Sequence, residues 1–113
     1  MAKPVFVTAS PAPSVISGDI TLEAGAWYGH IHIRHPEVVL WQLQDTLSDP
    51  DYICASTTVQ GAFVFICEGN TNDEYGDPLV VTVLPQVDGS NIVTTAYYDE
   101  NYLRHQPKIW SKP

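Results

Sequence analysis

Three of the four histidines fall within residues 29–37, and Arg34 stands among them. In this segment histidine or arginine alternates with isoleucine, so an extended chain would present His30, His32 and Arg34 on one face and turn the isoleucines toward a core. Imidazole exchanges protons near neutral pH, and guanidinium pairs with phosphate oxygens. The pattern therefore indicates a site that handles a phosphate group.

A helix is expected directly after this cluster. Pro36 suits the first position of a helix and places His35 at its N-cap side, and the charge of Glu37 complements the helix dipole. Apolar residues then recur at the four-residue spacing of a buried stripe. We predict one amphipathic helix over residues 36–48, whose first N–H groups lie beside Arg34 and favour an anion such as phosphate.

Two other interpretations of the histidines remain open. The spacing His-x-His-x-x-His resembles the zinc-binding element of the metallo-β-lactamases, but Arg34 occupies the place of an aspartate there and puts a cation beside any metal. The chain is also too short for that fold. Alternatively, these side chains cap the helix and are solvated, with a structural role only. The expectation is a site with no metal and no other cofactor.

The later part of the chain has the pattern of strands, and its Asp88-Gly89 pair is typical of a hairpin turn. A strand is also expected at 19–22. Residues 1–18 are rich in Pro, Ser and Ala, which predicts an extended lead-in with a short strand at 4–8 before a single domain over 19–113. One helical window followed by strand windows favours an α+β fold with an antiparallel sheet. The later strands are predicted over residues 52–56, 62–68, 79–84 and 91–98.

Polar side chains on the last predicted strand add to the candidate site. Strand alternation places Thr95 and Tyr97 on one face. By itself this pattern is that of an ordinary strand, because Thr and Tyr are good strand residues.

Composition limits the classes of function. The chain has 113 residues and a formal net charge of −8, which disfavours a nonspecific duplex binder with a basic surface. Cys54 and Cys67 lie in apolar runs, which indicates buried thiols in a reducing compartment rather than a disulfide. No stretch is apolar enough for a membrane span, so a cytoplasmic protein is expected.

Four short motifs, taken together, resemble the phage and prophage nuclease-like domains grouped with the barnase, EndoU, colicin and RelE ribonucleases. In this group a His-Ile pair precedes Arg-His-Pro-Glu, an Asp-Pro exit from the helix follows, and a Thr-Ala-Tyr strand comes last. The resemblance spans about residues 27–103. The matching residues are His30-Ile31, Arg34-His35-Pro36-Glu37, Asp49-Pro50 and Thr95-Ala96-Tyr97.

The resemblance implies one main helix packed on a four-stranded antiparallel sheet and metal-independent cleavage of RNA by its 2′-hydroxyl. It implies that His30 and His35 act as base and acid, in an order left open, and that Arg34 clamps the phosphate. Thr95 would donate a hydrogen bond to phosphate, and Tyr97 would stack on a base or contact the phosphate. The implied substrate-binding residues are Glu37 and Trp27, whereas His32 and His105 lie outside the pattern and should tolerate substitution.

RNA is therefore the expected partner, with a protein partner or inhibitor as a second. An alternative from a different class is a catalytically inactive, acidic protein-binding module, such as a phage accessory protein or an inhibitor of a host factor. The net charge and the loop residues Asp73, Glu74 and Asp77 favour it, because acidic surfaces steer basic partners.

Overall fold

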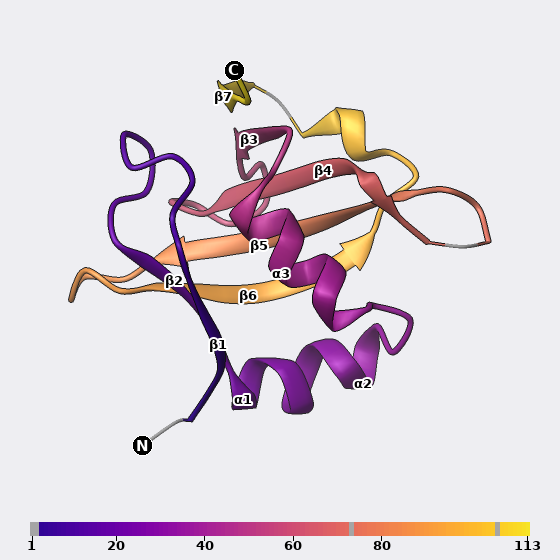
Figure 1. Ribbon diagram of the computed structural model, residues 1–113, viewed down its shortest axis with the longest axis horizontal. Coiled ribbons are helices and arrows are strands. Elements are labelled where there is room, and N and C mark those ends of the chain that lie inside the picture. Colours follow the sequence, from indigo (N-terminus) through magenta and orange to yellow (C-terminus); the bar gives the residue numbers. More distant parts are fainter. Residues whose placement is uncertain (1–2, 73, 106) are drawn as a thin grey trace.

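The computed structural model describes residues 3–72, 74–105 and 107–113. These residues form one sheet with the strand order β1-β2-β6-β5-β4-β3-β7 (Figure 1). Strands β2 and β6 run parallel, and the other neighbours run antiparallel. The strands are β1 (Pro4–Ala9), β2 (Asp19–Glu23), β3 (Tyr52–Ala55), β4 (Phe63–Thr71), β5 (Pro78–Pro85), β6 (Asn91–Tyr98) and β7 (Lys108–Ser111).

This sheet shows that the predicted architecture, one main helix on a four-stranded antiparallel sheet, is wrong. The four later strands are present as β3 to β6, but β1 and β2 extend the sheet beyond β6 and β7 extends it beyond β3. The sheet is mixed because β2 joins β6 in parallel. Ile20 and Leu22 of β2 are fully buried, so the short N-terminal strands are held by the same core as the rest.

The predicted helix over 36–48 begins later than expected. Helix α3 (Leu40–Ser48) has nine residues, and Pro36 and Glu37 lie in a turn before it. The backbone of His35 is outside the helical region, with φ −134° and ψ 64°, and the N–H of Val38 closes the turn on the carbonyl of His35 at 3.1 Å. Val38 is buried, so this turn is part of the packed structure rather than the first turn of a helix.

The segment expected to be extended, residues 29–34, is helical. It belongs to a continuous run of α1 (Ala24–Ala26), a wide π-helical turn η1 (Trp27–Ile31) and α2 (His32–Arg34), which lies alongside β6 (Figure 1). Trp27 and Ile31, four residues apart, are buried, whereas Ile33 is 68% exposed. Two isoleucines on one face of a strand would share an environment, and these do not.

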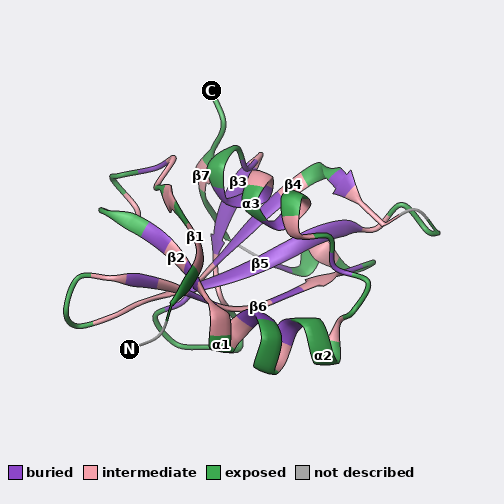
Figure 2. Cartoon of the chain, turned by 60° about the horizontal axis from the view of Figure 1, so that its bottom comes forward, coloured by how far each residue is buried: buried purple, intermediate pink, exposed green. Residues whose placement is uncertain are grey.

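The core lies between the helical segments and the sheet. Ile31 of η1 and Leu43 and Leu47 of α3 pack with Phe65 and Val81 of the central strands. Figure 2 shows the central strands as the most buried part of the chain, with exposed residues on the outer sides of the helices. The helical segments are thus anchored to the sheet by shared core side chains.

The lead-in over residues 1–18 takes part in this core. Residues Pro4–Ala9 form β1, which pairs with β2, and Ala12 and Ile16 are buried in the core cluster. Residues 4–18 therefore pack with the rest of the chain in one folded unit.

The opposite face of the sheet carries a second, smaller cluster. Tyr52 and Cys54 of β3 pack there with Val64, Ile66 and Val80, and Tyr102 covers them. Tyr102 lies in the 3-10 helix η2 (Tyr102–Arg104), which follows β6. The C-terminal segment therefore crosses the face of the sheet that the other helices leave open.

Several local predictions are confirmed. Strands β5 and β6 form the expected hairpin, in which Gly89 has φ +91°, a conformation that side chains with a Cβ rarely adopt. Cys54 and Cys67 are free thiols, and the predicted burial holds for Cys54, whereas Cys67 is only half-buried. Within the residues that the structure describes, no helix is long and apolar enough to span a membrane.

Candidate functional site

The histidine cluster lies at the carboxyl end of the helical run 24–34, not at the amino end of a helix. The N–H of His35 donates to the carbonyl of Ile31 at 2.7 Å and closes the last turn. Helix α3 begins only at Leu40, so the anion site expected from the N–H groups of a helix over 36–48 is not formed. The carbonyl end of a helix favours cationic side chains, and here it carries Arg34 and His35.

His35 and Tyr97, which are distant in sequence, come together at the edge of β6. Their ring centroids are 5.6 Å apart, with 32° between the ring planes. Strand β2 pairs with β6 only through Asn91 and Ile92, so the rest of that edge is left to the helical run. The carboxylate of Glu37 lies 3.7 Å from Nδ1 of His35. The imidazole thus lies near both an aromatic ring and a carboxylate.

His30 and Arg34 are positioned by the same helical run. They are four residues apart, so their side chains project from neighbouring turns of one side. His30 is half-buried and Arg34 is exposed. His32 instead lies against the ring of Trp27, at 5.6 Å between centroids. Arg34 and His35 are adjacent at the end of this run, and His30 lies about one turn earlier. Within the described residues, no hydrogen bond or ring contact joins His30 to Arg34 or to His35.

Thr95 and Trp27 stand apart from this contact. Thr95 is two residues before Tyr97 on the same face of β6, opposite Thr82 of β5. Within the described residues, no hydrogen bond joins Thr95 to a histidine. Trp27 is 7% exposed and packs in the core, so its ring is not presented to a substrate. Its predicted role in binding finds no support in this geometry.

A second arginine, which the sequence analysis missed, reaches the same tyrosine. Arg104 donates to the hydroxyl of Tyr97 at 3.2 Å and pairs with Asp99 at 3.2 Å. The Tyr97 hydroxyl and then the Asp99 carboxylate raise the pKa of Arg104. Arg104-His105 repeats the dipeptide Arg34-His35, which is the sequence signal that could have indicated it.

His105 is part of the same network and is buried. Its Nε2 lies 3.0 Å from the carboxylate of Asp99, and each residue is 6% exposed. Asp99 therefore holds both His105 and Arg104. A substitution at His105 removes a buried partner of a buried carboxylate, so the expectation that this position tolerates change finds no support here.

Within residues 3–72, 74–105 and 107–113, no group of three or more His, Cys, Asp or Glu side chains is placed to hold a metal ion.

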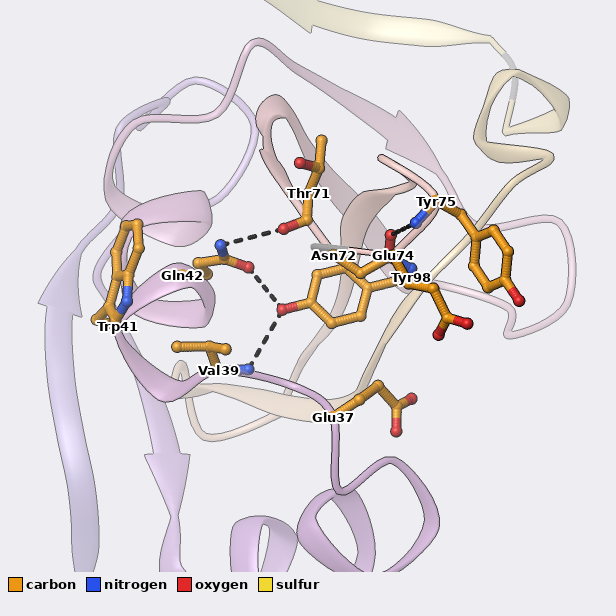
Figure 3. Close-up of a pocket in the computed structure, with 9 residues that line it drawn as sticks. All are labelled: Glu37, Val39, Trp41, Gln42, Thr71, Asn72, Glu74, Tyr75 and Tyr98. Carbon is orange, nitrogen blue, oxygen red and sulfur yellow. Dashed lines mark hydrogen bonds between the residues drawn. The ribbon is translucent and has the colours of Figure 1, made fainter.

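A pocket of about 520 Å³ lies next to the His35 contact, between the start of α3 and the loop that joins β4 to β5 (Figure 3). Glu37 belongs to both features, because it faces His35 and lines the pocket. Of the acidic loop residues, Glu74 lines the pocket, and Asp73 lies outside the described residues. The lining residues are Glu37, Val39, Trp41, Gln42, Thr71, Asn72, Glu74, Tyr75 and Tyr98.

Comparison with known proteins provides no assignment for this site: no family model, no curated protein and no solved structure matches the chain.

Proposed function

We propose that this protein is a metal-independent endoribonuclease whose reaction takes place at the edge of β6, beside His35. The observation that supports the proposal is the contact between the rings of His35 and Tyr97, at 5.6 Å. It joins two of the predicted groups that are distant in sequence, and Arg34 and His30 belong to the helical run that ends beside His35.

The reaction needs a base, an acid and a cation. The base removes the proton of the 2′-hydroxyl, whose oxygen bonds to the adjacent phosphorus. The 5′-oxygen leaves with a proton from the acid, which produces a 2′,3′-cyclic phosphate and a 5′-hydroxyl. His30 and His35 supply the two proton-transfer groups, and Arg34 offsets the charge that builds up on the phosphorus oxygens.

Tyr97 and Arg104 complete the arrangement. The Tyr97 ring supports the imidazole of His35, and its hydroxyl accepts a hydrogen bond from Arg104. Arg104 is 55% exposed at its side chain, so its guanidinium has room to bind a phosphate while Asp99 orients it. An endoribonuclease with a net charge of −8 needs such local cations, because phosphate contacts dominate affinity for RNA.

The test is cleavage of a defined RNA in the presence of EDTA, with analysis of the product ends. We expect 2′,3′-cyclic phosphates, and a loss of about 100-fold or more in rate for His35→Ala and for His30→Ala, the usual scale for a proton-transfer group. Arg34→Lys should also be damaging, because an ammonium lacks the planar fork of guanidinium. His32→Ala, on the same helical run, is the matched control and should retain activity.

Two outcomes would contradict the proposal. Cleavage that disappears with EDTA and returns with zinc would support the metal interpretation. Activity that survives in His35→Ala would show that the His35–Tyr97 contact is not the reaction centre.

The dependence of the cleavage rate on pH should be bell-shaped in the parent protein, because two imidazoles must hold opposite protonation states. Each histidine variant should lose one limb of this curve.

A second candidate function is that of a protein-binding module for a basic partner. The observation that favours it is the acidic, aromatic pocket beside α3, in a chain with thirteen acidic and five basic residues. Arg34→Ala separates the two candidates. It abolishes cleavage under the first and leaves the binding of a basic partner unchanged under the second.

A further inference from the structure

The walls of the pocket beside α3 are fixed by internal hydrogen bonds. The hydroxyl of Tyr98 donates to Oε1 of Gln42 at 2.6 Å, and the N–H of Val39 donates to the same hydroxyl at 3.3 Å. Nε2 of Gln42 donates to the carbonyl of Thr71 at 3.2 Å (Figure 3). Both polar atoms of Gln42 are therefore engaged in holding the wall, and the start of α3 is tied to β6.

The loop side of the pocket is fixed in a similar way. Oδ1 of Asn72 accepts from the N–H groups of Tyr75 and Asp77 at 3.0 and 3.1 Å. These bonds fix the backbone from which the Tyr75 side chain projects.

Two large aromatic side chains remain exposed on this frame. Trp41 is 61% exposed and Tyr75 is 74% exposed, and both line the pocket. In Figure 3 the ring of Tyr98 lies between them. The contact of large aromatic side chains with water is unfavourable, so covering them with a ligand stabilises the complex. The faces of their rings also carry negative electrostatic potential, which attracts cations.

The charged groups of the pocket have one sign. Glu37 and Glu74 line it, and no lysine or arginine is among the described residues that do. Aromatic faces and carboxylates attract the same type of group, a cation with an apolar stem. Guanidinium suits both, because it stacks flat on an aromatic ring and pairs with a carboxylate through two N–H groups.

We propose that this pocket binds an arginine side chain that a basic segment of a partner protein presents. The inference rests on the second candidate function and gives it a site. The volume of about 520 Å³ takes one such side chain together with part of its flanking backbone. The net charge of −8 attracts a basic segment over a longer range and raises its rate of encounter.

A nucleobase is the competing occupant, and the geometry favours it less. Specific recognition of a base needs free donors and acceptors at its edge, in addition to a ring for stacking. Oε1 and Nε2 of Gln42 each already make one hydrogen bond within the wall, and Oδ1 of Asn72 accepts two, which leaves these groups less capacity for the edge of a base. The phosphate attached to the base would also meet Glu37 and Glu74.

The experiment is a titration of the whole protein with the amidated peptide Gly-Arg-Gly-Arg-Gly at low ionic strength. The matched probe replaces each arginine with citrulline, which has nearly the same shape and no charge. Binding is followed through the indole N–H signal of Trp41 by NMR, assigned from its absence in Trp41→Phe. We expect the arginine peptide to shift this signal and the citrulline peptide to leave it in place.

Substitutions then locate the site. Tyr75→Ala and Glu74→Gln should each weaken binding about two- to five-fold, the scale of an exposed cation–π contact or a surface ion pair. Glu100→Gln is the matched control, because it removes the same charge from an exposed position that does not line the pocket. It should leave the affinity unchanged. A urea unfolding midpoint equal to that of the parent establishes that each variant is folded.

The possible results distinguish failure of the proposed arginine pocket from failure of the second candidate function. If the arginine peptide binds but Glu100→Gln weakens it as much as Glu74→Gln does, the pocket is not the site, and the second candidate function stands. If the arginine peptide does not bind, both fail. A shift of the Trp41 signal by the citrulline peptide, or by a nucleoside monophosphate at lower concentration than the arginine peptide, would overturn the assignment of a cation.

Discussion

The side chain of Asn70 ties β4 to α3, and its removal is the sharpest test of how the fold positions the site. It is 6% exposed, and its amide nitrogen lies 2.9 Å from Oδ2 of Asp45, 3.1 Å from Oγ1 of Thr46 and 3.4 Å from the carbonyl of Gln42. The amide has two N–H groups to share among these acceptors. Asn70→Ala removes them all and leaves no donor in their place.

The expected cost follows from the kinds of bond that are lost. A hydrogen bond to a neutral group contributes about 0.5–1.5 kcal/mol, and one to a charged group about 1.5–3 kcal/mol. The buried hydroxyl of Thr46 also loses a partner. We expect Asn70→Ala to lower the free energy of unfolding by about 2–4 kcal/mol, and the melting temperature by roughly 10 °C.

Urea unfolding, followed by tryptophan fluorescence, measures this change: if the dependence of the free energy of unfolding on urea concentration is unchanged, a lower midpoint reports a lower stability. Asn70→Asp extends the test. It puts a second carboxylate beside Asp45, so it should cost more than the alanine variant at neutral pH and recover part of the loss on acidification to about pH 4, as carboxylates protonate. Asn101→Ala, at an exposed position, is the control and should change stability by less than about 0.5 kcal/mol. An Asn70→Ala midpoint equal to that of this control would refute the reasoning.

Three further predictions follow from single groups. The hydroxyl of Tyr52 is buried without a hydrogen-bond partner among the described residues, and this burial also raises the pKa of Tyr52. Because Tyr52→Phe removes an unpaired polar group, it should leave the free energy of unfolding unchanged or increase it by about 1 kcal/mol in the same urea assay. Burial also raises the pKa of the Cys54 and Cys67 thiols, so iodoacetamide at pH 8 should label both more slowly in the folded protein than in urea, with the fully buried Cys54 the slower. Hydrogen bonds from Ser90 lower the pKa of Asp88, so this carboxylate stabilises the folded state above its unfolded pKa and loses that contribution as the pH falls through the lowered value. Acid unfolding of Asp88→Ala should therefore show less dependence on pH in this range, and an unchanged profile would contradict the assignment.

The strands could be predicted because their sequence pattern and their packing agree. Residues 91–94 alternate between buried and less buried positions, and an irregularity in the pairing with β5 shifts this alternation before the buried Ala96. The Asp88-Gly89 turn is local chemistry that needs no tertiary contact. The position of β1 and β2 could not be predicted in this way. The pairing of β2 with β6 joins residues that most of the chain separates, and nothing in residues 19–23 indicates a parallel partner; β1 then pairs with β2.

The prediction of an extended segment at residues 29–34 is wrong because the same residues fit both the two-residue period of a strand and the 3.6-residue period of a helix. Isoleucine at every second position is the pattern of a strand, but Trp27 and Ile31 are also spaced as one face of a helix. Tertiary packing decides between them. Burial of Trp27 and Ile31 against the core favours the helix, and Ile33 is left in solvent.

The candidate site could also be predicted only in part, because tertiary packing decides which side chains meet. The contact of His35 with Tyr97 places two predicted residues together, whereas Arg104 and Asp99 were not foreseen. Their position depends on how the segment after β6 folds back along the sheet, which no local pattern in residues 99–105 specifies.

The parallel pairing of β2 with β6 also has a consequence for the order in which the protein assembles. A ribosome delivers β1 and β2 first, and their buried side chains Ile20 and Leu22 have no sheet to join until β6 has emerged. Strands β3 to β6 pair in sequence order and can close as each arrives. The side chains of Ile20 and Leu22 can therefore be fully covered only after most of the chain has been synthesised, which makes the docking of β2 a late step of folding.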